Sequence, residues 1–306
     1  MMTMLRIATR RSLLSMRQSQ AVADAIRSAH PAVEVELVSI VTSGDRQGGP
    51  LAPVGGKGLF TAELEAALRE GRVQVAVHSA KDLPADMPED LAIAAVPARQ
   101  NARDALICRT GGGVEQLPAA ALVGTASLRR RALLLACRPD LKVVPIRGNV
   151  ETRLRKVLGD QHSDLSATVL AVSGLNRSGL ASEFAGKIHP MEIETFIPAA
   201  GQGALAVQCL TADGKTAALL SAIDDKPSHQ SLLAERRVLQ ALGAGCHSCL
   251  AVHVAPSGQR WGGLAMAART DGSDMMRFEA RAVSAEKTAD QMLENMFAAG
   301  VAELFR

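Results

Sequence analysis

Apolar residues recur along the chain with two spacings, every second residue in short runs and every third or fourth residue in longer ones. The first spacing is typical of strands and the second of helices. Strands are predicted at residues 5–9, 33–41, 73–77, 104–108, 142–146, 168–172 and 201–207. Helices are predicted at residues 12–29, with Ser12 as N-cap, and at residues 59–70, 127–137 and 149–158. Strands that alternate with helices in this order predict an α/β fold.

Two prolines, Pro97 and Pro198, bracket the second half of this alternating block. An economical path leaves a first lobe near Pro97, builds a second lobe and returns near Pro198. We therefore predict two α/β lobes joined by two crossing strands, with a ligand cleft between them. The first lobe is discontinuous and takes residues 1–97 and 199–220, and the second takes residues 98–198.

The pattern changes in the last part of the chain. A predicted helix at residues 228–242 precedes three strand-like runs and a final helix at residues 287–305. Strands grouped apart from helices are typical of an α+β arrangement. We therefore predict a small third domain, α+β in class, over residues 221–306.

The composition points to a small anionic ligand rather than to nucleic acid. Tyr is absent, Trp occurs once and Phe six times, so aromatic platforms for stacking single-stranded bases are not expected. The net charge is only +3 and no long Lys/Arg run is present, which argues against a nucleic-acid partner. Positive charge instead gathers in a few short segments.

Cysteine count and hydropathy bear on the compartment. Five cysteines are an odd number for a disulfide framework, so free thiols and a reducing, cytoplasmic location are expected. No apolar stretch approaches the length of a membrane span, so no membrane partner is expected. The N-terminus is rich in Arg and Ser like a transit peptide, but the strand at residues 5–9 leaves too little before it for a removable segment. Cys108, Cys137 and Cys209 stand in apolar runs and are predicted to be core residues.

Cationic residues gather in segments that follow apolar runs: residues 77–84 (VHSAKDLP), 124–130 (GTASLRR) and 147–153 (RGNVETR). Together they hold four arginines predicted to bind, one lysine and one candidate acid, Asp82. Arginine binds carboxylates and phosphates through paired, planar hydrogen bonds. The segments therefore predict a site for a small polyanion.

The run of arginines at residues 129–131 opens a predicted helix, where backbone N–H groups and the helix dipole favour an anion. Neighbouring helical residues diverge by about 100°, so all three cannot face one ligand. We expect Arg129 and Arg130 to bind it and Arg131 to face solvent. The alternative is a solvated basic face. Arg147 and Arg153 repeat the geometry after the next strand, which favours the binding interpretation.

Asp82 follows a buried strand, and strand ends are where open α/β sheets hold ligands. Among cations this carboxylate should be ionised, able to stabilise a cation or relay a proton. The alternative is a structural ion pair with Lys81. The glycine-rich residues 42–58 are predicted to form a mobile loop, with Lys57 brought over the ligand as its lid.

Residues 246–249 (CHSC) form a C-x-x-C pair in a loop that begins with small residues. The pair lacks the strand–helix context of a redox motif and a second ligand pair for zinc, so no metal is predicted. Small neighbours leave a thiol uncovered, which suits a covalent attachment point. For Cys249 a buried, structural role is expected.

In combination and order, these motifs resemble the porphobilinogen deaminase family. The matching segments are residues 6–10 (RIATR), 56–60 (GKGLF), 76–84 (AVHSAKDLP), 124–130 (GTASLRR), 147–154 (RGNVETRL), 201–204 (GQGA), 234–236 (AER) and 245–246 (GC). The loop departs from the usual family pattern after Cys246, where His247-Ser248-Cys249 stands in place of Gln/Ser-Val-Pro. The second thiol, Cys249, could compete for a group attached to Cys246 or form a disulfide with it.

The resemblance implies a transferase of haem biosynthesis, monomeric and cytoplasmic, built from three domains. It also implies that the first two domains resemble the lobes of periplasmic binding proteins. It implies the head-to-tail condensation of four porphobilinogen molecules with loss of ammonia, after which water releases hydroxymethylbilane. It also implies a dipyrromethane cofactor, made from the substrate and tethered to Cys246 as a thioether, and Asp82 as the catalytic acid.

The resemblance further assigns binding residues. Those implied for the cofactor are Cys246, Lys81, Asp82, Thr125, Ser127, Arg129, Arg130 and Gly148. Those implied for the substrate are Arg10, Ser12, Arg147, Arg153, Gln202, Phe60 and Lys57. Each porphobilinogen carries an acetate and a propionate, so a growing chain gains two negative charges per ring, which explains the many cations.

Two other interpretations stay open at this point. A noncatalytic anion-binding protein of the same two-lobed architecture would explain the arginines but not Asp82 or the loop cysteine. A thiol-redox or zinc protein would use Cys246 and Cys249 but would leave the arginine clusters without a role.

Overall fold

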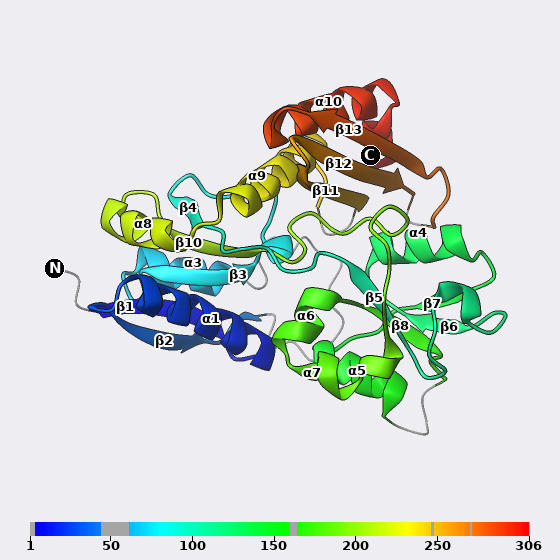
Figure 1. The fold of residues 1–306 in the computed structure, drawn as a ribbon, viewed down its shortest axis with the longest axis horizontal. Helices are drawn as coiled ribbons and strands as arrows, with labels where there is room; N and C mark the ends of the chain where they lie inside the picture. Colours follow the sequence, from blue (N-terminus) through cyan, green and yellow to red (C-terminus); the bar gives the residue numbers. More distant parts are fainter. Residues whose placement is uncertain (1–3, 44–60, 160–163, 246–247, 270, 306) are drawn as a thin grey trace. The chain divides into compact units, whose positions relative to one another are not determined.

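A computed structural model describes residues 4–43, 61–159, 164–245, 248–269 and 271–305 (Figure 1). Lys57, Phe60, Cys246 and nearly all of the predicted loop at residues 42–58 lie outside the described residues. The chain divides into two compact units. The first unit is Met1–Arg99 with Ala204–His229, and the second is Gln100–Gly203 with Gln230–Arg306. The predicted three-domain division and the cleft stay predictions.

The first unit is built on one five-stranded sheet in the order β2-β1-β3-β10-β4. Its strands are β1 (Met4–Arg10), β2 (Glu34–Ile40), β3 (Val75–Ser79), β4 (Leu91–Ala95) and β10 (Leu205–Leu210). Strands β1, β2 and β3 run parallel, and β10 pairs antiparallel with both β3 and β4. The carboxyl ends of β1 and β3 therefore lie at the same edge of this sheet.

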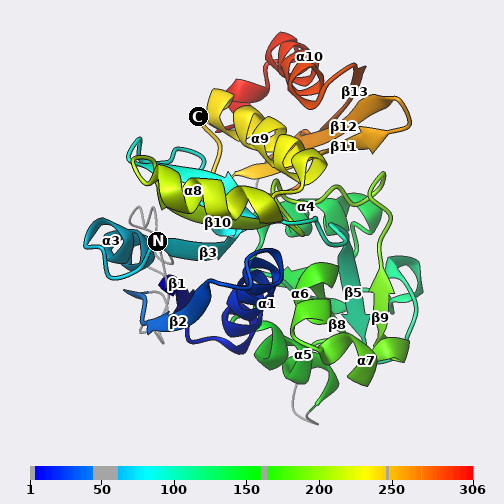
Figure 2. The same ribbon diagram turned by 60° about the vertical axis from the view of Figure 1, so that its left-hand side comes forward.

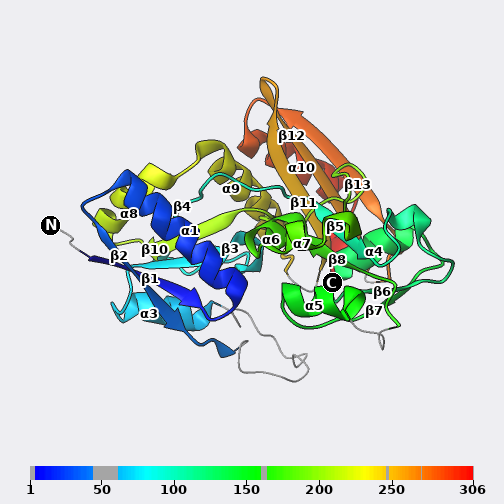
Figure 3. The ribbon, with the colours of Figure 1, turned by 60° about the horizontal axis from the view of Figure 1, so that its bottom comes forward.

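Helices cover both faces of that sheet (Figure 3). Helices α1 (Leu13–Ala29) and α8 (Gly214–Leu220) pack on one face, where Val22 and Ile26 of α1 meet Ile7 of β1. Helix α3 (Ala62–Arg69) packs on the other face through Leu64 and Leu68. Strands buried on both faces tend to be continuously apolar, as Val75–Val77 of β3 are, whereas in β1 the buried apolar run is limited to Ile7 and Ala8.

The second unit holds a second five-stranded sheet in the order β7-β6-β8-β5-β9. Its elements in chain order are β5 (Asp104–Cys108), β6 (Leu122–Gly124), α4 (Leu128–Cys137), β7 (Lys142–Val144), α5 (Val150–Leu158), β8 (Ala167–Ala171), α6 (Val172–Arg177), α7 (Leu180–Glu183) and β9 (Ile188–Pro190). Strands β6 and β7 are parallel neighbours, so α4 and α5 both begin at one edge of the sheet.

The same unit contains an antiparallel sheet of β11 (Cys249–Ser257), β12 (Arg260–Ala268) and β13 (Met276–Ala282). Helices α9 (Lys226–Ala241) and α10 (Ala285–Ala298) pack on one face of it, as Figure 2 shows. Its other face, which includes Cys249 and Met266, packs against Leu133 and Leu134 of α4. The C-terminal sheet is thereby joined through one apolar core to the helix that carries the arginine run.

The predicted α/β class, with two sheet-bearing lobes and a small C-terminal α+β portion, is confirmed. The strand predicted at residues 201–207 begins only at Leu205, because Gly201 (φ 71°) and Gly203 (φ 92°) form a turn. A Cβ at Gly203 would come within 2.4 Å of the Gln100 carbonyl oxygen, so the turn needs glycine there. The final helix predicted at residues 287–305 ends at Ala298, and Gly300 (φ 74°) separates it from a short 3₁₀ turn.

Three other predictions differ from the structure. Cys137 is exposed at the end of α4 rather than in the core, whereas Cys108 and Cys209 are buried as predicted. The strand predicted at residues 142–146 stops at Val144. Short elements were missed, namely β4, β6, β9, α6, α7 and α8, because segments of three to seven residues carry too few positions to show a period.

Candidate functional site

The first unit places four predicted residues at the carboxyl ends of β1 and β3. Arg10 ends β1, and Ser12 caps α1 by accepting the Ser15 backbone N–H at 3.2 Å. Lys81 and Asp82 lie in a single 3₁₀ turn directly after β3. Because the two strands are parallel neighbours, the structure brings these four residues to one sheet edge.

The carboxylate of Asp82 is exposed on its turn. Within the described residues it forms no ion pair with Lys81, so the structural alternative considered for this pair is not realised. Its backbone is fixed by a buried strand behind it, since Ala76 and Val77 have relative exposures of 0% and 6%. An ionised acid held on a rigid turn and open to solvent can stabilise a cation that develops beside it.

His78 lies in β3 just before this turn. Its Nε2 is 3.1 Å from Oε1 of Gln208, and both side chains are buried. Burial lowers the pKa of His78 to about 4, with the Arg10 charge acting in the same direction and the Gln208 hydrogen bond opposing it. The imidazole is therefore neutral near pH 7 and adds no charge to this edge.

The second unit repeats a strand-to-helix turn at β6–α4 and at β7–α5. Ser127 caps α4 by accepting the Arg130 backbone N–H at 3.3 Å, and Asn149 caps α5 by accepting that of Thr152 at 2.8 Å. The hydroxyl oxygen of Thr125 accepts the Ser127 N–H at 3.2 Å. Two helix N-termini at one sheet edge favour an anion there, as the repeated sequence pattern predicts.

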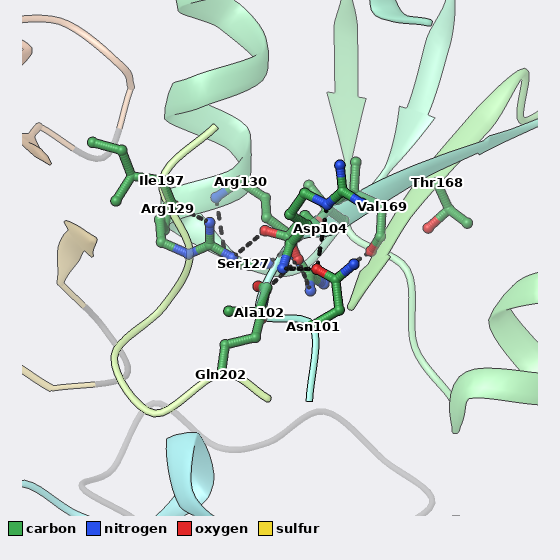
Figure 4. Close-up of polar contacts among 12 residues, drawn as sticks. Asn101, Ala102, Asp104, Ser127, Arg129, Arg130, Thr168, Val169, Ile197 and Gln202 are labelled. Atoms are coloured by element: carbon green, nitrogen blue, oxygen red, sulfur yellow. Dashed lines mark hydrogen bonds and ion pairs between the residues drawn. The ribbon is translucent and has the colours of Figure 1, made fainter. Parts of the chain in front are cut away.

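Arg129 and Arg130 are almost completely buried, with relative exposures of 4% and 6%. Nη2 of Arg129 donates to Oδ2 of Asp104 at 2.6 Å, and Nη2 of Arg130 donates to Oδ1 at 2.7 Å (Figure 4). The alternative of a solvated basic face is thus excluded for these two residues. Arg131 is half-buried and donates to the Val143 carbonyl at 3.2 Å, so the expectation that it faces solvent is wrong.

Asp104 corrects the prediction of a single acid among the cations. Its side chain is fully buried at the start of β5. Gln202, also fully buried, adds a third donor, with Nε2 at 2.9 Å from Oδ1 of Asp104 and at 2.7 Å from the Ala102 carbonyl oxygen. Asp104 belongs to no motif in the sequence. A polar residue at the start of an apolar strand is common, so its position alone does not indicate a role in a site.

The buried cluster keeps an excess of positive charge, because two guanidinium groups share the carboxylate of Asp104. Burial lowers the pKa of Arg129. The charge of Asp104 acts to raise this pKa, and the charge of Arg130 acts to lower it further. Nε of Arg130 is buried and has no hydrogen-bond partner among the described residues. A buried donor without a partner is costly, so the cluster is suited to a ligand that brings an anionic oxygen.

Arg147, Gly148 and Arg153 surround the N-terminus of α5. Arg147 is exposed, and Nε of Arg153 donates to the Gly148 carbonyl at 2.7 Å. Gly148 has φ 116°, and a Cβ there would lie 2.6 Å from Cγ2 of Thr152, so the turn requires glycine. These residues lie at the same sheet edge as Thr125 and Ser127, because β6 and β7 pair in parallel register.

Two further charged residues with main-chain partners, one half-buried and one fully buried, were not among the predicted binding residues. Arg177, at the end of α6, donates from Nη2 to the Gly203 carbonyl at 2.7 Å, and burial lowers its pKa to about 10. Glu235 of α9 is fully buried and accepts the backbone N–H groups of Gly201 at 2.6 Å and Val254 at 2.9 Å. Arg177 carries the signal used for the other arginines, a cation soon after an apolar strand.

Comparison with known proteins identifies the family. A family model described as porphobilinogen deaminase, dipyromethane cofactor binding domain, matches residues 5–218. The porphobilinogen deaminase of Syntrophotalea carbinolica is 40% identical over 97% of this chain and 93% of its own length. That of Sorangium cellulosum is 43% identical over 92% of both chains. The chain belongs to the porphobilinogen deaminase family.

Solved structures with lower similarity include two periplasmic-type binding proteins. The methionine-binding protein MetQ is 10% identical, with a TM-score of 0.45 over 76% of this chain and 96% of its own. The aliphatic sulphonate binding protein SsuA of Escherichia coli is 13% identical, with a TM-score of 0.41 over 78% of this chain and 70% of its own.

The cysteines of this porphobilinogen deaminase family member are distinguished by burial. Cys249 begins β11 and is 1% exposed, and burial raises the pKa of its thiol to about 11. Neither a redox nor a zinc role suits a thiol that is held protonated. The described cysteines are free, and no group of three metal-ligating side chains occurs among the described residues.

The same part of the chain has no helix with the length and apolarity that a membrane crossing requires.

Proposed function

We propose that this chain is a hydroxymethylbilane synthase. It joins four porphobilinogen molecules head to tail, releases one ammonia at each addition, and ends with hydrolytic release of the linear tetrapyrrole. Family membership supports the reaction. The observation that carries it to this chain's own residues is the buried pair Arg129 and Arg130, which has an excess of positive charge. Its Arg130 Nε donor has no partner in the described part of the chain.

The cations of both units bind carboxylates. Each porphobilinogen carries an acetate and a propionate, and charge-assisted hydrogen bonds from guanidinium groups are the strongest neutral-pH interaction with such groups. The residues proposed to bind the cofactor or substrate are Arg10, Ser12, Lys81, Thr125, Ser127, Arg129, Arg130, Arg147, Gly148, Arg153 and Gln202, together with Lys57 and Phe60. The helix N-termini at Ser127 and Asn149 add backbone donors.

Asp82 is proposed as the catalytic acid. Departure of ammonia leaves positive charge on the substrate, and pyrrole N–H groups carry part of it. A carboxylate oxygen can accept those N–H groups and stabilise the charge as it develops. The exposed position of Asp82, without an ion pair to Lys81 among the described residues, leaves both oxygens available for this task.

Cys246 is proposed to hold the dipyrromethane as a thioether. Bound there, the dipyrromethane supplies the pyrrole carbon to which the first substrate is joined. Burial and a raised thiol pKa argue against its neighbour Cys249 as the attachment residue. A tether also keeps the growing chain at the arginines, which makes each condensation effectively intramolecular.

A monomeric, cytoplasmic enzyme without nucleic-acid or membrane partners is part of the proposal. The odd number of cysteines supports a reducing compartment, because it does not suit a disulfide framework. Family membership also supports a division into three domains. The proposed domains are residues 1–97 with 199–220, residues 98–198 and residues 221–306.

Intact mass of the denatured protein tests the function. The wild-type chain should carry the mass of two pyrrole units, and Cys246→Ser should lack it. The loaded wild-type protein should convert porphobilinogen to a linear tetrapyrrole. A wild-type chain that gains no mass on incubation with porphobilinogen, and forms no product, would show that the proposed function is wrong.

A further inference from the structure

The carboxylate of Asp104 holds two neighbouring guanidinium groups by their terminal nitrogens. It accepts Nη2 of Arg129 at 2.6 Å and Nη2 of Arg130 at 2.7 Å. Each arginine also donates from Nη1 to a main-chain carbonyl, Arg129 to Ile197 at 2.7 Å and Arg130 to Val169 at 2.8 Å. A planar group fixed at both terminal nitrogens cannot turn, so both guanidinium groups have one orientation.

Helix geometry alone would separate these two side chains. Consecutive residues of a helix diverge by about 100°, and Arg129 and Arg130 both belong to α4. Asp104 stands on a different element, β5, and one carboxylate draws both guanidinium groups to itself. The convergence that the sequence pattern of α4 does not provide therefore comes from Asp104.

Asp104 is itself held in place. Gln202 donates from Nε2 to its Oδ1 at 2.9 Å and is anchored to the Ala102 carbonyl oxygen at 2.7 Å. With donors from three side chains on its two oxygens, the carboxylate has one orientation. The Arg129 guanidinium also lies 6.0 Å from the centre of the buried Phe196 ring, which limits its movement further.

We propose that Asp104 is a positioning residue for primer binding, which fixes Arg129 and Arg130 so that both address the carboxylates of one dipyrromethane. The inference rests on the proposed function. The proposal also accounts for Nε of Arg130. The terminal nitrogens of Arg130 donate to Asp104 and to the Val169 carbonyl, and the buried Nε has no partner among the described residues. An anionic oxygen of the ligand would complete it.

A positioning residue and a simple counter-ion can be distinguished, because the two roles predict opposite changes in anion affinity when Asp104 is removed. A counter-ion lowers the net positive charge, so removing it would strengthen the binding of an anion. A positioning residue orients the donors, so removing it weakens the binding even though the cluster becomes more positive. A purely structural residue changes the stability of the loaded and the empty protein equally.

The test compares melting temperatures of loaded and empty protein. The wild type, Asp104→Asn and a control variant are each prepared with Cys246 intact and with Cys246→Ser, and intact mass confirms which carry the primer. The control is Asp140→Asn, because Asp140 pairs with Arg138 at 2.7 and 2.8 Å in the same unit but is solvent-exposed. Loading should raise the melting temperature of the wild type and the control equally. Asp104→Asn should lose half of that rise or more, or fail to load.

A rise that is unchanged or larger in Asp104→Asn would overturn the proposal in favour of a structural or counter-ion role. If Asp104→Asn does not fold, Asp104→Glu replaces it, because this variant keeps the charge and displaces the carboxylate by one methylene. The same loss of the primer-dependent rise in melting temperature is then expected, and a full rise would overturn the proposal.

Turnover gives a second readout. The kcat of loaded Asp104→Asn should fall by about tenfold or more, because the binding groups are misplaced. A wild-type chain that stays without primer after incubation with porphobilinogen, and forms no product, would instead refute the proposed function, before any Asp104 variant is compared.

Discussion

Asp82 in the first unit and Asp104 in the second are both carboxylates beside cationic residues at strand ends, but their surroundings differ. Asp104 is fully buried and accepts hydrogen bonds from two guanidinium groups and an amide. Asp82 is exposed on a short turn, with no ion pair to its neighbour Lys81 in the described part of the chain. A carboxylate whose oxygens are occupied by protein donors holds structure, and one whose oxygens are available can serve a substrate.

This difference shows why proximity to arginines does not identify a catalytic acid. Desolvation makes the buried carboxylate dependent on its partners, so its loss affects the fold and the arginines together. The exposed carboxylate interacts with water until a substrate replaces it, so its loss should affect the reaction and little else. Four variants can break or sharpen this contrast.

The largest effect is expected for Asp82→Asn. The amide is nearly isosteric but carries no charge, so turnover should fall by about 10²- to 10⁴-fold, the usual contribution of a positioned acid or base. Stability in urea should stay within about 0.5 kcal/mol of the wild type, because the side chain is exposed. Steady-state rates with porphobilinogen check the first value. The exposed acid Glu89 offers a control, and equal rates for Asp82→Asn and Glu89→Gln would remove Asp82 from the mechanism.

Asp104→Ala should have the largest effect on folding. The change leaves two buried guanidinium groups without their shared carboxylate, and breaking a buried ion pair from one side costs about 3–5 kcal/mol. Urea denaturation of the chain with Cys246→Ser measures this cost without any contribution from a bound primer. Asp82→Ala, measured in the same background, should be nearly neutral. Similar losses for both variants would contradict the contrast between the two acids.

His78 should give the first unit a stability that depends on pH. Burial lowers its pKa from 6.5 to about 4, so between these values the unfolded chain binds a proton that the folded chain does not. Its contribution is therefore lost as the pH falls from 6.5 toward 4, up to about 3 kcal/mol. The free energy of unfolding, measured between pH 7 and pH 4, should fall less steeply for His78→Gln than for the wild type. Parallel curves would show that His78 is not responsible.

The smallest effect is expected for Glu151→Gln. Glu151 pairs with Arg155 at 2.9 Å one turn along α5, and both side chains are exposed. Exposed pairs of this kind contribute about 0.3–0.5 kcal/mol, and salt screens them. Denaturation at low and high salt should show a loss of this size that disappears at high salt. The contrast with Asp104 would then rest on burial rather than on ion pairing as such.

Much of the fold could be predicted from apolar spacing. The strands at residues 5–9, 33–41 and 104–108 and the N-cap Ser12 match the structure closely, and the helices predicted from residues 127 and 149 begin one residue later, because period and capping are local properties. The placement of Asp82 after a strand, and the repeated geometry of the β6–α4 and β7–α5 residues, also followed from strand ends. Glycine conformations did not, and the turn at Gly201 and the break at Gly300 were both read as regular structure.

The sequence by itself determined which residues carry charge and where strands and helices begin, and it was sufficient to recognise the family. Only the tertiary structure decided how those charges are used. Asp104, Arg129 and Gln202 are up to 98 residues apart, and their pairing depends on strand β5, helix α4 and a turn meeting in one buried place. Burial is a property of that packing, and it separates an acid that holds arginines from an acid that is open to a substrate.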